Sequence, residues 1–339
     1  MDIPADDLYP RGPQHVPAGL SRPNSRYRHQ ARVAVGTLIL FFLAYFGLAW
    51  WFVQTTIRSF QTVSAGSADN EMSLLFAGMT CGLLSVFMLK GLFFFCRGAE
   101  SSNMEVTAET QPALFAFLLR LADEVGAPRP HRVFLSSDVN AAVFYDISLL
   151  NLLVPSRKNL VIGLPLVNVL TLSELKAVLA HEFGHFAQRS MAVGSWVYIA
   201  QQVAMALVAR RDWLDKFLNF ISRIDLRVAW IGWGLRLVVW SVRSLLDSLL
   251  SLVVLAQRAL SRQMEFQADL VAVALTGSDE LIHALHKLRA ADEAWDQTLR
   301  FLAGQLRRGQ LAKDLFGVHT LISSRLGQIK DDAWWGNIP

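Results

Sequence analysis

Charged residues are scarce in this chain of 339 residues. Asp, Glu, Lys and Arg make up 18% of it and hydrophobic residues 53%, whereas soluble globular proteins carry about 25% charged residues. This composition excludes a fully water-soluble protein, a disordered chain and a coiled coil. The chain also has only two cysteines, too few for a disulfide scaffold. Cys81 and Cys96 lie in one apolar run, where a helix would hold them about 22 Å apart, too far to bond with each other.

Long uncharged runs indicate a membrane protein. The net charge of +4 does not indicate nucleic acid, since no block of Lys and Arg interleaved with aromatic residues is present. Residues 33–53 form an uncharged run that is long enough to cross a hydrocarbon core of about 30 Å, and residues 72–89 form another. We therefore expect two transmembrane helices within residues 33–96. Residues 1–32, rich in Pro, Arg and Ser, read as a disordered cytoplasmic tail.

Basic residues near the ends of these runs predict the orientation. Five arginines precede the first run, whereas Arg58 alone lies between the runs, and Lys90 and Arg97 flank the end of the second. The positive-inside rule then places the N-terminus and everything after Arg97 in the cytoplasm. Nothing in the sequence contradicts a bacterial inner (cell) membrane as the location.

The composition becomes that of a soluble domain from about Glu105. Residues 111–124 have the apolar periodicity of an amphipathic helix, with Pro112 near the start and Gly126 after the end. Short strands are expected at residues 132–135, 140–145 and 159–162. Ser173 is expected to cap the next helix. The predicted fold is mainly α with a small β-sheet.

The sequence AVLAHEFGHFAQ is the most specific chemical signal. It places His181, Glu182 and His185 in an H-E-x-x-H motif on a predicted helix. Residues four apart lie on one helix face, about 5–6 Å from each other, so both imidazoles can bind one Zn²⁺. Glu182 lies beside them, able to take a proton from a metal-bound water. Alone, the motif is also compatible with histidines that are packed or solvated and bind no metal. A third ligand elsewhere in the chain would favour the metal site.

The segment SRQMEFQADLVAVAL supplies a candidate for that ligand. Glu265 and Asp269 are four residues apart on a predicted helix, beside an apolar stripe. Glu265 can complete a His₂Glu set that leaves the fourth position to water. Asp269 can accept a hydrogen bond from the free ring nitrogen of a ligand histidine. The alternative, a solvated helix face, is disfavoured by the apolar stripe.

The two segments together resemble the M48 peptidases, a family of membrane zinc metallopeptidases, over residues 105–189 and 257–285. The resemblance implies an integral membrane zincin of the HExxH gluzincin type with one Zn²⁺ per chain. It also implies the roles of five residues: the zinc ligands His181, His185 and Glu265, the general base Glu182, and Asp269 as the partner of a ligand histidine.

Two further segments are compared with the same family. VNAAVFYD resembles an N-A-F/Y segment, which implies that Asn140 and the adjoining edge strand hold the substrate backbone; the alternative is a turn residue before a strand. The family also has a T-H-P segment followed by an arginine near the catalytic water. His319 and Arg325 match its spacing, but Thr320 replaces the proline. We favour the interpretation that this segment lies beyond the end of this chain, which leaves the transition-state stabiliser unidentified.

The chain returns to apolar sequence between the expected ligands, over residues 191–256. His185 and Glu265 must meet on one side of the bilayer, so the intervening chain crosses it twice or not at all. A membrane-spanning helical hairpin matches the pattern of the bacterial members of the family. Basic residues in its connecting loop count against the hairpin. A charged stripe within residues 228–256 fits either a helix that faces a bundle interior or a water-filled cavity, or a helix on the membrane surface. The hairpin is the favoured expectation.

The sequence therefore predicts a membrane-bound zinc metalloendopeptidase that acts on protein or peptide substrates beside a lipid bilayer. Residues 97–190 and 257–339 would be the two parts of its metallopeptidase domain. Misfolded membrane proteins or their cytosolic loops are the expected substrates by resemblance, and no nucleic acid partner is expected. The alternatives are a catalytically silent zinc-binding scaffold and a CAAX-type processing protease for a lipidated peptide. The sequence does not indicate the oligomeric state.

Overall fold

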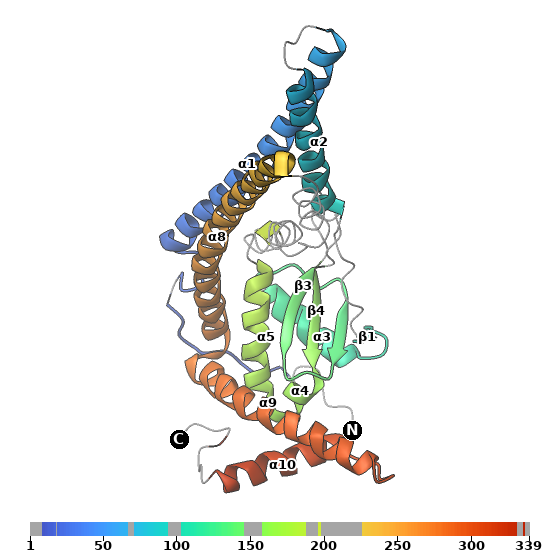
Figure 1. The fold of residues 1–339 in the computed structure, drawn as a ribbon. Helices are drawn as coiled ribbons and strands as arrows, with labels where there is room; N and C mark the ends of the chain where they lie inside the picture. The colour runs from blue at the N-terminus through green and yellow to red at the C-terminus, as the bar shows by residue number, and fades with distance from the viewer. Residues whose placement is uncertain are drawn as a thin grey trace. The chain divides into compact units, whose positions relative to one another are not determined.

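The structure is a computed structural model that describes residues 9–17, 19–66, 71–93, 103–145, 158–187, 196–197, 226–330 and 335 (Figure 1). The chain divides into two compact units. The first combines Met1–Asn24, Ala99–Met191 and Arg262–Pro339, and the second combines Ser25–Gly98 and Ala192–Ser261.

Two long helices, α1 (Ser25–Ser64) and α2 (Glu71–Phe93), pack against each other in the second unit. Small residues allow close packing, since a Cβ atom on Gly78 would lie 2.9 Å from the Ser59 side chain. The Tyr45 hydroxyl donates to the Met88 carbonyl across the pair. Both helices lie where the uncharged runs predict them, and α1 begins earlier than the first run.

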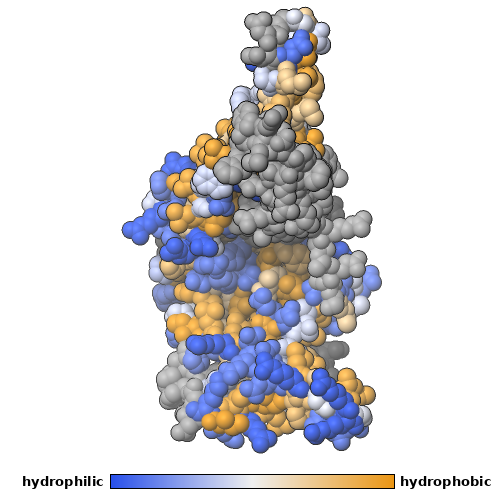
Figure 2. Space-filling model, in the orientation of Figure 1, coloured by the Kyte–Doolittle hydropathy of each residue, from blue (hydrophilic) through white to orange (hydrophobic). Residues whose placement is uncertain are grey.

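The surface of this helix pair is apolar. Figure 2 shows hydrophobic residues along it, and the exposed side chains of α1 include Leu43, Trp50 and Trp51. Large exposed apolar surfaces are uncommon on soluble monomers and suit contact with lipid. Ser25–Ser64 and Leu237–Thr276 are long and apolar enough to cross a membrane. The second of these stretches belongs to α8 (Leu226–Thr276).

Helix α8 differs from the expected organisation of residues 191–256. Residues 228–256 are helical, but they continue without a break into the segment that carries Glu265. The chain has neither Gly nor Pro from 235 to 276, so nothing stops the helix at the expected boundary near residue 257. The first arm of the expected hairpin lies outside the described residues, apart from 196–197.

The first unit contains a mixed four-stranded sheet with the order β1-β2-β4-β3. Its strands are β1 (Met104–Val106), β2 (Val133–Ser136), β3 (Ala141–Tyr145) and β4 (Lys158–Gly163). β2 and β4 are parallel, whereas β1 and β3 pair antiparallel with their neighbours. The sequence predicted the last three strands and missed β1. β3 is at one edge of the described sheet.

Helices cover this sheet and form the core of the unit. They are α3 (Pro112–Val125), α4 (Leu164–Val169), α5 (Leu172–Ala187), the end of α8, α9 (Ser278–Leu306) and α10 (Leu315–Ile329). Leu118 of α3, Leu160 of β4 and Phe183 of α5 are completely buried in one cluster. Helix α3 ends as predicted, with Gly126 in the left-handed conformation at φ 71°.

Two local expectations differ from the structure. Within residues 1–32, the predicted disordered tail, Tyr9 is 7% exposed in the core of the first unit and helix α1 already begins at Ser25. A Pro- and Arg-rich composition does not reveal one anchoring aromatic ring. The predicted cap Ser173 lies inside α5, and Thr171 caps the helix instead, because Thr171 and Glu174 have the spacing of a capping box.

Candidate metal and active site

Helix α5 presents the H-E-x-x-H residues from a firmly held element. At its start, the Thr171 hydroxyl accepts from the Glu174 N–H, and the Glu174 carboxylate accepts from the Thr171 N–H. The ammonium group of Lys287 on α9 lies 2.7 Å from the same carboxylate. At the other end, Lys158 of β4 donates to the Phe186 carbonyl, where a cation stabilises the helix C-terminus.

Helix α8 brings Glu265 and Asp269 to α5 at a close crossing. A Cβ atom on Gly184 would lie 3.0 Å from Cα and 3.3 Å from Cβ of Ala268. The two helices therefore approach each other because both positions carry small residues. Glycine in a helix costs about 1 kcal/mol relative to alanine, and here that cost is offset by the approach of the second helix.

Three donor atoms converge at this crossing. The Nε2 atoms of His181 and His185 are 3.2 Å apart, and Oε2 of Glu265 lies 3.3 Å from the first and 3.5 Å from the second. Donors at about 2.0–2.1 Å from a tetrahedral Zn²⁺ are about 3.4 Å from each other. Among the described residues, these three form the one group of His, Cys, Asp and Glu that could hold a metal ion.

The surroundings of the histidines favour metal binding. Oδ1 of Asp269 lies 3.0 Å from Nδ1 of His181, so the carboxylate can accept the ring N–H and leave Nε2 free for a metal. Burial and the neighbouring His181 ring lower the pKa of His185, which favours the neutral imidazole that metals bind. The Glu265 side chain is 55% exposed, so water can reach the group.

Glu182 is held beside these donors by the edge strand. Its carboxylate accepts a hydrogen bond from the Val143 backbone. Burial and the charge of Glu265 raise the pKa of Glu182 to about 7 against the opposing effect of that hydrogen bond. A carboxyl group with a pKa near neutrality is suited to both take up and release a proton at physiological pH. The sequence carried no signal for the Val143 contact, which is a backbone interaction.

The structure places Asn140 immediately before β3, with an exposed side chain. Its carbonyl accepts from the Gly163 N–H at 2.7 Å. Because antiparallel pairs alternate, Ala141 and Val143 direct their backbone groups away from β4, toward the open edge. The backbone hydrogen bond of Asn140 thus belongs to the same register, in which Ala141 and Val143 face the edge.

His319 and Arg325 are not brought into the group. His319 is fully buried, and its Nε2 lies 3.2 Å from the Ala291 carbonyl of α9. Its Nδ1 lies 3.4 Å from the Asn168 amide, and its ring packs edge-on to Trp295. Both nitrogens of a neutral imidazole are thereby used in helix packing. Arg325 is exposed on α10.

Comparison with known proteins fits this arrangement. A family model described as "Peptidase family M48" matches residues 108–333, more than half of the chain. The chain belongs to peptidase family M48. The match includes α5, the end of α8 and β3, and it confirms the resemblance inferred from the two motifs.

Similarity to individual proteins extends over more residues than the family model matches. Protease HtpX of Haemophilus ducreyi is 27% identical over 275 residues, which cover 77% of this chain and 85% of that protein. Protease HtpX of Actinobacillus pleuropneumoniae serotype 5b is 26% identical over 272 residues, with the same coverage of 77% and 85%. A Protease HtpX homolog of Streptococcus equi subsp. equi is 26% identical over 244 residues, covering 67% and 75%. No solved structure matches the chain.

Proposed function

We propose that this M48 protein is a membrane-bound, zinc-dependent metalloendopeptidase. The convergence of the donors of His181, His185 and Glu265, at spacings that suit a tetrahedral ion, carries the proposal. These three residues would hold one Zn²⁺ per chain, and Asp269 would fix the tautomer of His181. Bound Zn²⁺ supplies Lewis acidity, which polarises a carbonyl group and makes a coordinated water a nucleophile near neutral pH.

Glu182 would be the catalytic general base and then the general acid. It would take a proton from the attacking water and return it to the amide nitrogen of the substrate as the C–N bond breaks. The raised pKa of about 7 suits both steps. The Val143 hydrogen bond would hold the carboxylate in place for them.

The edge strand β3 would bind the substrate. An extended peptide can add to a free sheet edge through main-chain hydrogen bonds. Ala141 directs its backbone groups to that edge and Asn140 precedes it. Val143 would offer its carbonyl there, since its N–H donates to the Glu182 carboxylate. This arrangement favours unfolded or extended segments over folded ones, whatever their sequence.

The natural substrates would be misfolded membrane proteins or their cytosolic loops, so the role would be in membrane protein quality control. The relatives named Protease HtpX and the two apolar helical stretches support a place in a bacterial cell membrane. The distribution of basic residues supports a cytoplasmic N-terminus and catalytic domain.

The decisive experiment compares the detergent-purified, zinc-loaded wild type with Glu182→Gln on unfolded casein. We expect the wild type to cleave, and the variant to be slower by about 100-fold or more while it keeps one zinc per chain. Glu109→Gln is the matched control, because it makes the same change at an exposed position. It should cleave like the wild type.

Other results of this experiment would favour the silent zinc-binding scaffold or the CAAX-type processing protease. Zinc bound at one per chain without any cleavage would contradict the endopeptidase and support the silent scaffold. Cleavage of a lipidated CAAX peptide, but not of casein, would support the processing protease. Equal activity of wild type and Glu182→Gln would remove Glu182 from the mechanism.

A further inference from the structure

Residues 9–17 and 19–24 form a segment that we call the N-terminal strap. The strap precedes α1 in the sequence, yet it belongs to the same compact unit as α5 and the end of α8. Backbone hydrogen bonds from Leu20 to Pro17 and from Arg22 to Gly19 shape its second half into turns. Its contacts fall at two places, one on α3 and α5 and the other on α8.

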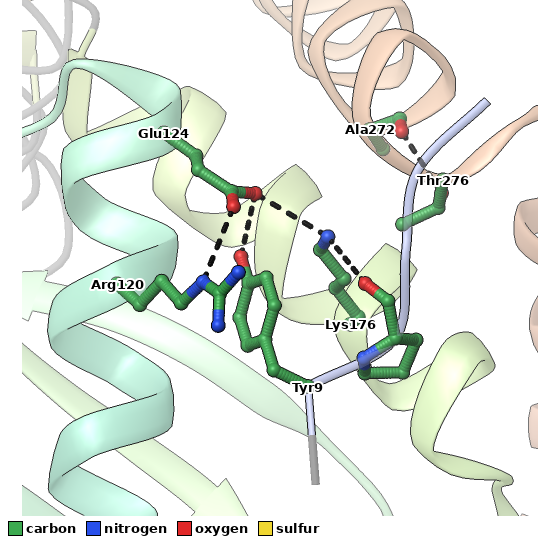
Figure 3. A network of polar contacts seen from close by, with 7 residues as sticks. Tyr9, Arg120, Glu124, Lys176, Ala272 and Thr276 are labelled. Atoms are coloured by element: carbon green, nitrogen blue, oxygen red, sulfur yellow. Dashed lines mark hydrogen bonds and ion pairs between the residues drawn. The ribbon is translucent and has the colours of Figure 1, made fainter. Parts of the chain in front are cut away.

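Tyr9 anchors the first end of the strap (Figure 3). Its hydroxyl donates to Glu124 of α3 at 2.6 Å, and its ring packs on Phe117 at a centroid distance of 5.0 Å. The Arg120 guanidinium lies 4.2 Å and the Lys176 ammonium 4.1 Å from the ring centroid. Cations over an aromatic face are attracted by its quadrupole.

Lys176 makes this anchor part of the HExxH helix. Its side chain on α5 is 2% exposed, and a buried ammonium group requires partners. Besides Glu124 at 3.3 Å, the partners are the Tyr9 ring and the Pro10 carbonyl at 2.9 Å. Two of the three therefore come from the strap.

The strap beyond Tyr9 and Pro10 lies against α8. A Cβ atom on Gly12 would lie 2.5 Å from the Leu275 carbonyl oxygen, so only glycine fits there. Further along the strap, the Ser21 carbonyl accepts a hydrogen bond from the Gln267 amide. Gln267 is 5% exposed, so the strap backbone satisfies a buried polar group on α8.

Gln267 lies between the two acidic residues of the candidate site. Two residues along a helix correspond to about 200° of rotation, so Gln267 faces away from both Glu265 and Asp269. Ala268, next to it, packs on Gly184 of α5. The turn of α8 that carries Glu265 is therefore held by α5 on one side and by the strap on another.

We propose that the N-terminal strap positions the third metal ligand, with Tyr9 and Gly12 as its positioning residues. This inference rests on the proposed function, because it assigns the strap to the zinc site. The strap touches neither the metal donors nor the substrate edge in its described contacts. It acts through α8, by keeping Glu265 within reach of His181 and His185.

The test measures zinc affinity by competition with a chromogenic chelator, on the full chain in detergent. Tyr9→Ala removes the anchor, and Gly12→Leu pushes the strap off α8 without making a cavity. We expect each to weaken zinc binding about tenfold, the lower end of the loss that follows removal of a partner of a metal ligand, because the strap acts on Glu265 through α8. The visible spectrum of the Co²⁺-loaded variants should change as well, because it reports the ligand geometry.

Limited trypsin cleavage at Arg11 and Arg22 establishes that the strap has been released. Tyr9→Phe keeps the ring between its two cations and should stay within about threefold of the wild type. Gln14→Ala alters an exposed strap residue and should change nothing. A released strap with unchanged zinc affinity and Co²⁺ spectrum overturns this inference alone. A wild type that binds no zinc overturns the proposed function and this inference with it.

Discussion

Gly184 shows how a single residue sets the geometry of the candidate site. It lies between the two histidines of the motif, on the side where Ala268 of α8 approaches. A larger side chain at either position would separate the helices that carry His181 and Glu265. The distance between the donors thus depends on two residues that carry no chemistry of their own.

Gly184→Ala is therefore expected to lower zinc affinity while it destabilises the metal-free chain by no more than about 2 kcal/mol. The added methyl group would strain the crossing by about 1–3 kcal/mol, and alanine would return up to about 1 kcal/mol of helix propensity. Zinc affinity and the unfolding temperature of the metal-free chain would be measured together. Gly304→Ala on α9, where nothing lies within 4 Å of the new methyl group, gives the propensity gain alone. Unchanged zinc affinity in Gly184→Ala would contradict this account.

The sequence indicated which residues converge at the candidate site, but not the contacts that surround them. Helical periodicity alone brings His181 and His185 to one face, and the acidic pair on the later helix supplied Glu265. The contacts that orient them are of another kind. They join segments that are distant in the chain: the Val143 backbone with Glu182, Gly184 with Ala268, and Tyr9 with Glu124. Backbone groups, small residues and single aromatic residues form no motif from which such contacts could be predicted.

At the scale of elements, helix α5 begins with a different capping residue from the one that the sequence predicts. Two candidate caps stand two residues apart, Thr171 and Ser173. Glu174 decides between them, because its carboxylate returns a hydrogen bond to the N–H of Thr171. Lys287 fixes the same carboxylate from α9. The cap is thus tied to tertiary packing.

Thr171→Ala is expected to lower the free energy of unfolding by about 1 kcal/mol, the usual cost of losing a side-chain cap. Ser173→Ala is the matched control and should stay within about 0.5 kcal/mol of the wild type. Chemical denaturation of the metal-free chain in detergent would measure both. The reverse order of the two effects would restore Ser173 as the cap.

The elements themselves were predicted to different degrees. Helix α3 and strands β2, β3 and β4 appear within a few residues of their expected positions. β1 was missed because three residues carry no periodicity. The length of α8 was missed because its composition changes near residue 257 from apolar to charged. Composition indicates whether a helix lies in an apolar or a polar environment. Whether the helix continues is indicated by the absence of Gly and Pro, which would end it.

At the scale of the whole molecule, the composition of the first unit constrains the membrane topology. Its three sequence segments form one compact body, which has to lie on one side of a bilayer. We therefore predict an even number of bilayer crossings between Asn24 and Ala99, and again between Met191 and Arg262. Helices α1 and α2, which the uncharged runs predict to be transmembrane, would supply two crossings for the first of these stretches. An even number of crossings follows without the distribution of basic residues, and it agrees with the orientation that this distribution predicts.

Cysteine labelling in bacterial cells tests that topology. In a background of Cys81→Ser and Cys96→Ser, single cysteines would replace the exposed residues Gln14, Ala65 and Gln310. We expect a membrane-impermeant maleimide to label Ala65→Cys in intact cells, because this residue follows α1 at the far end of the helix pair. Gln14→Cys and Gln310→Cys should react only after the membrane is permeabilised. Labelling of Gln14→Cys and Gln310→Cys from opposite sides would contradict a single body built from three segments. Labelling of both from outside would keep that body and reverse the orientation, so the positive-inside prediction would be wrong.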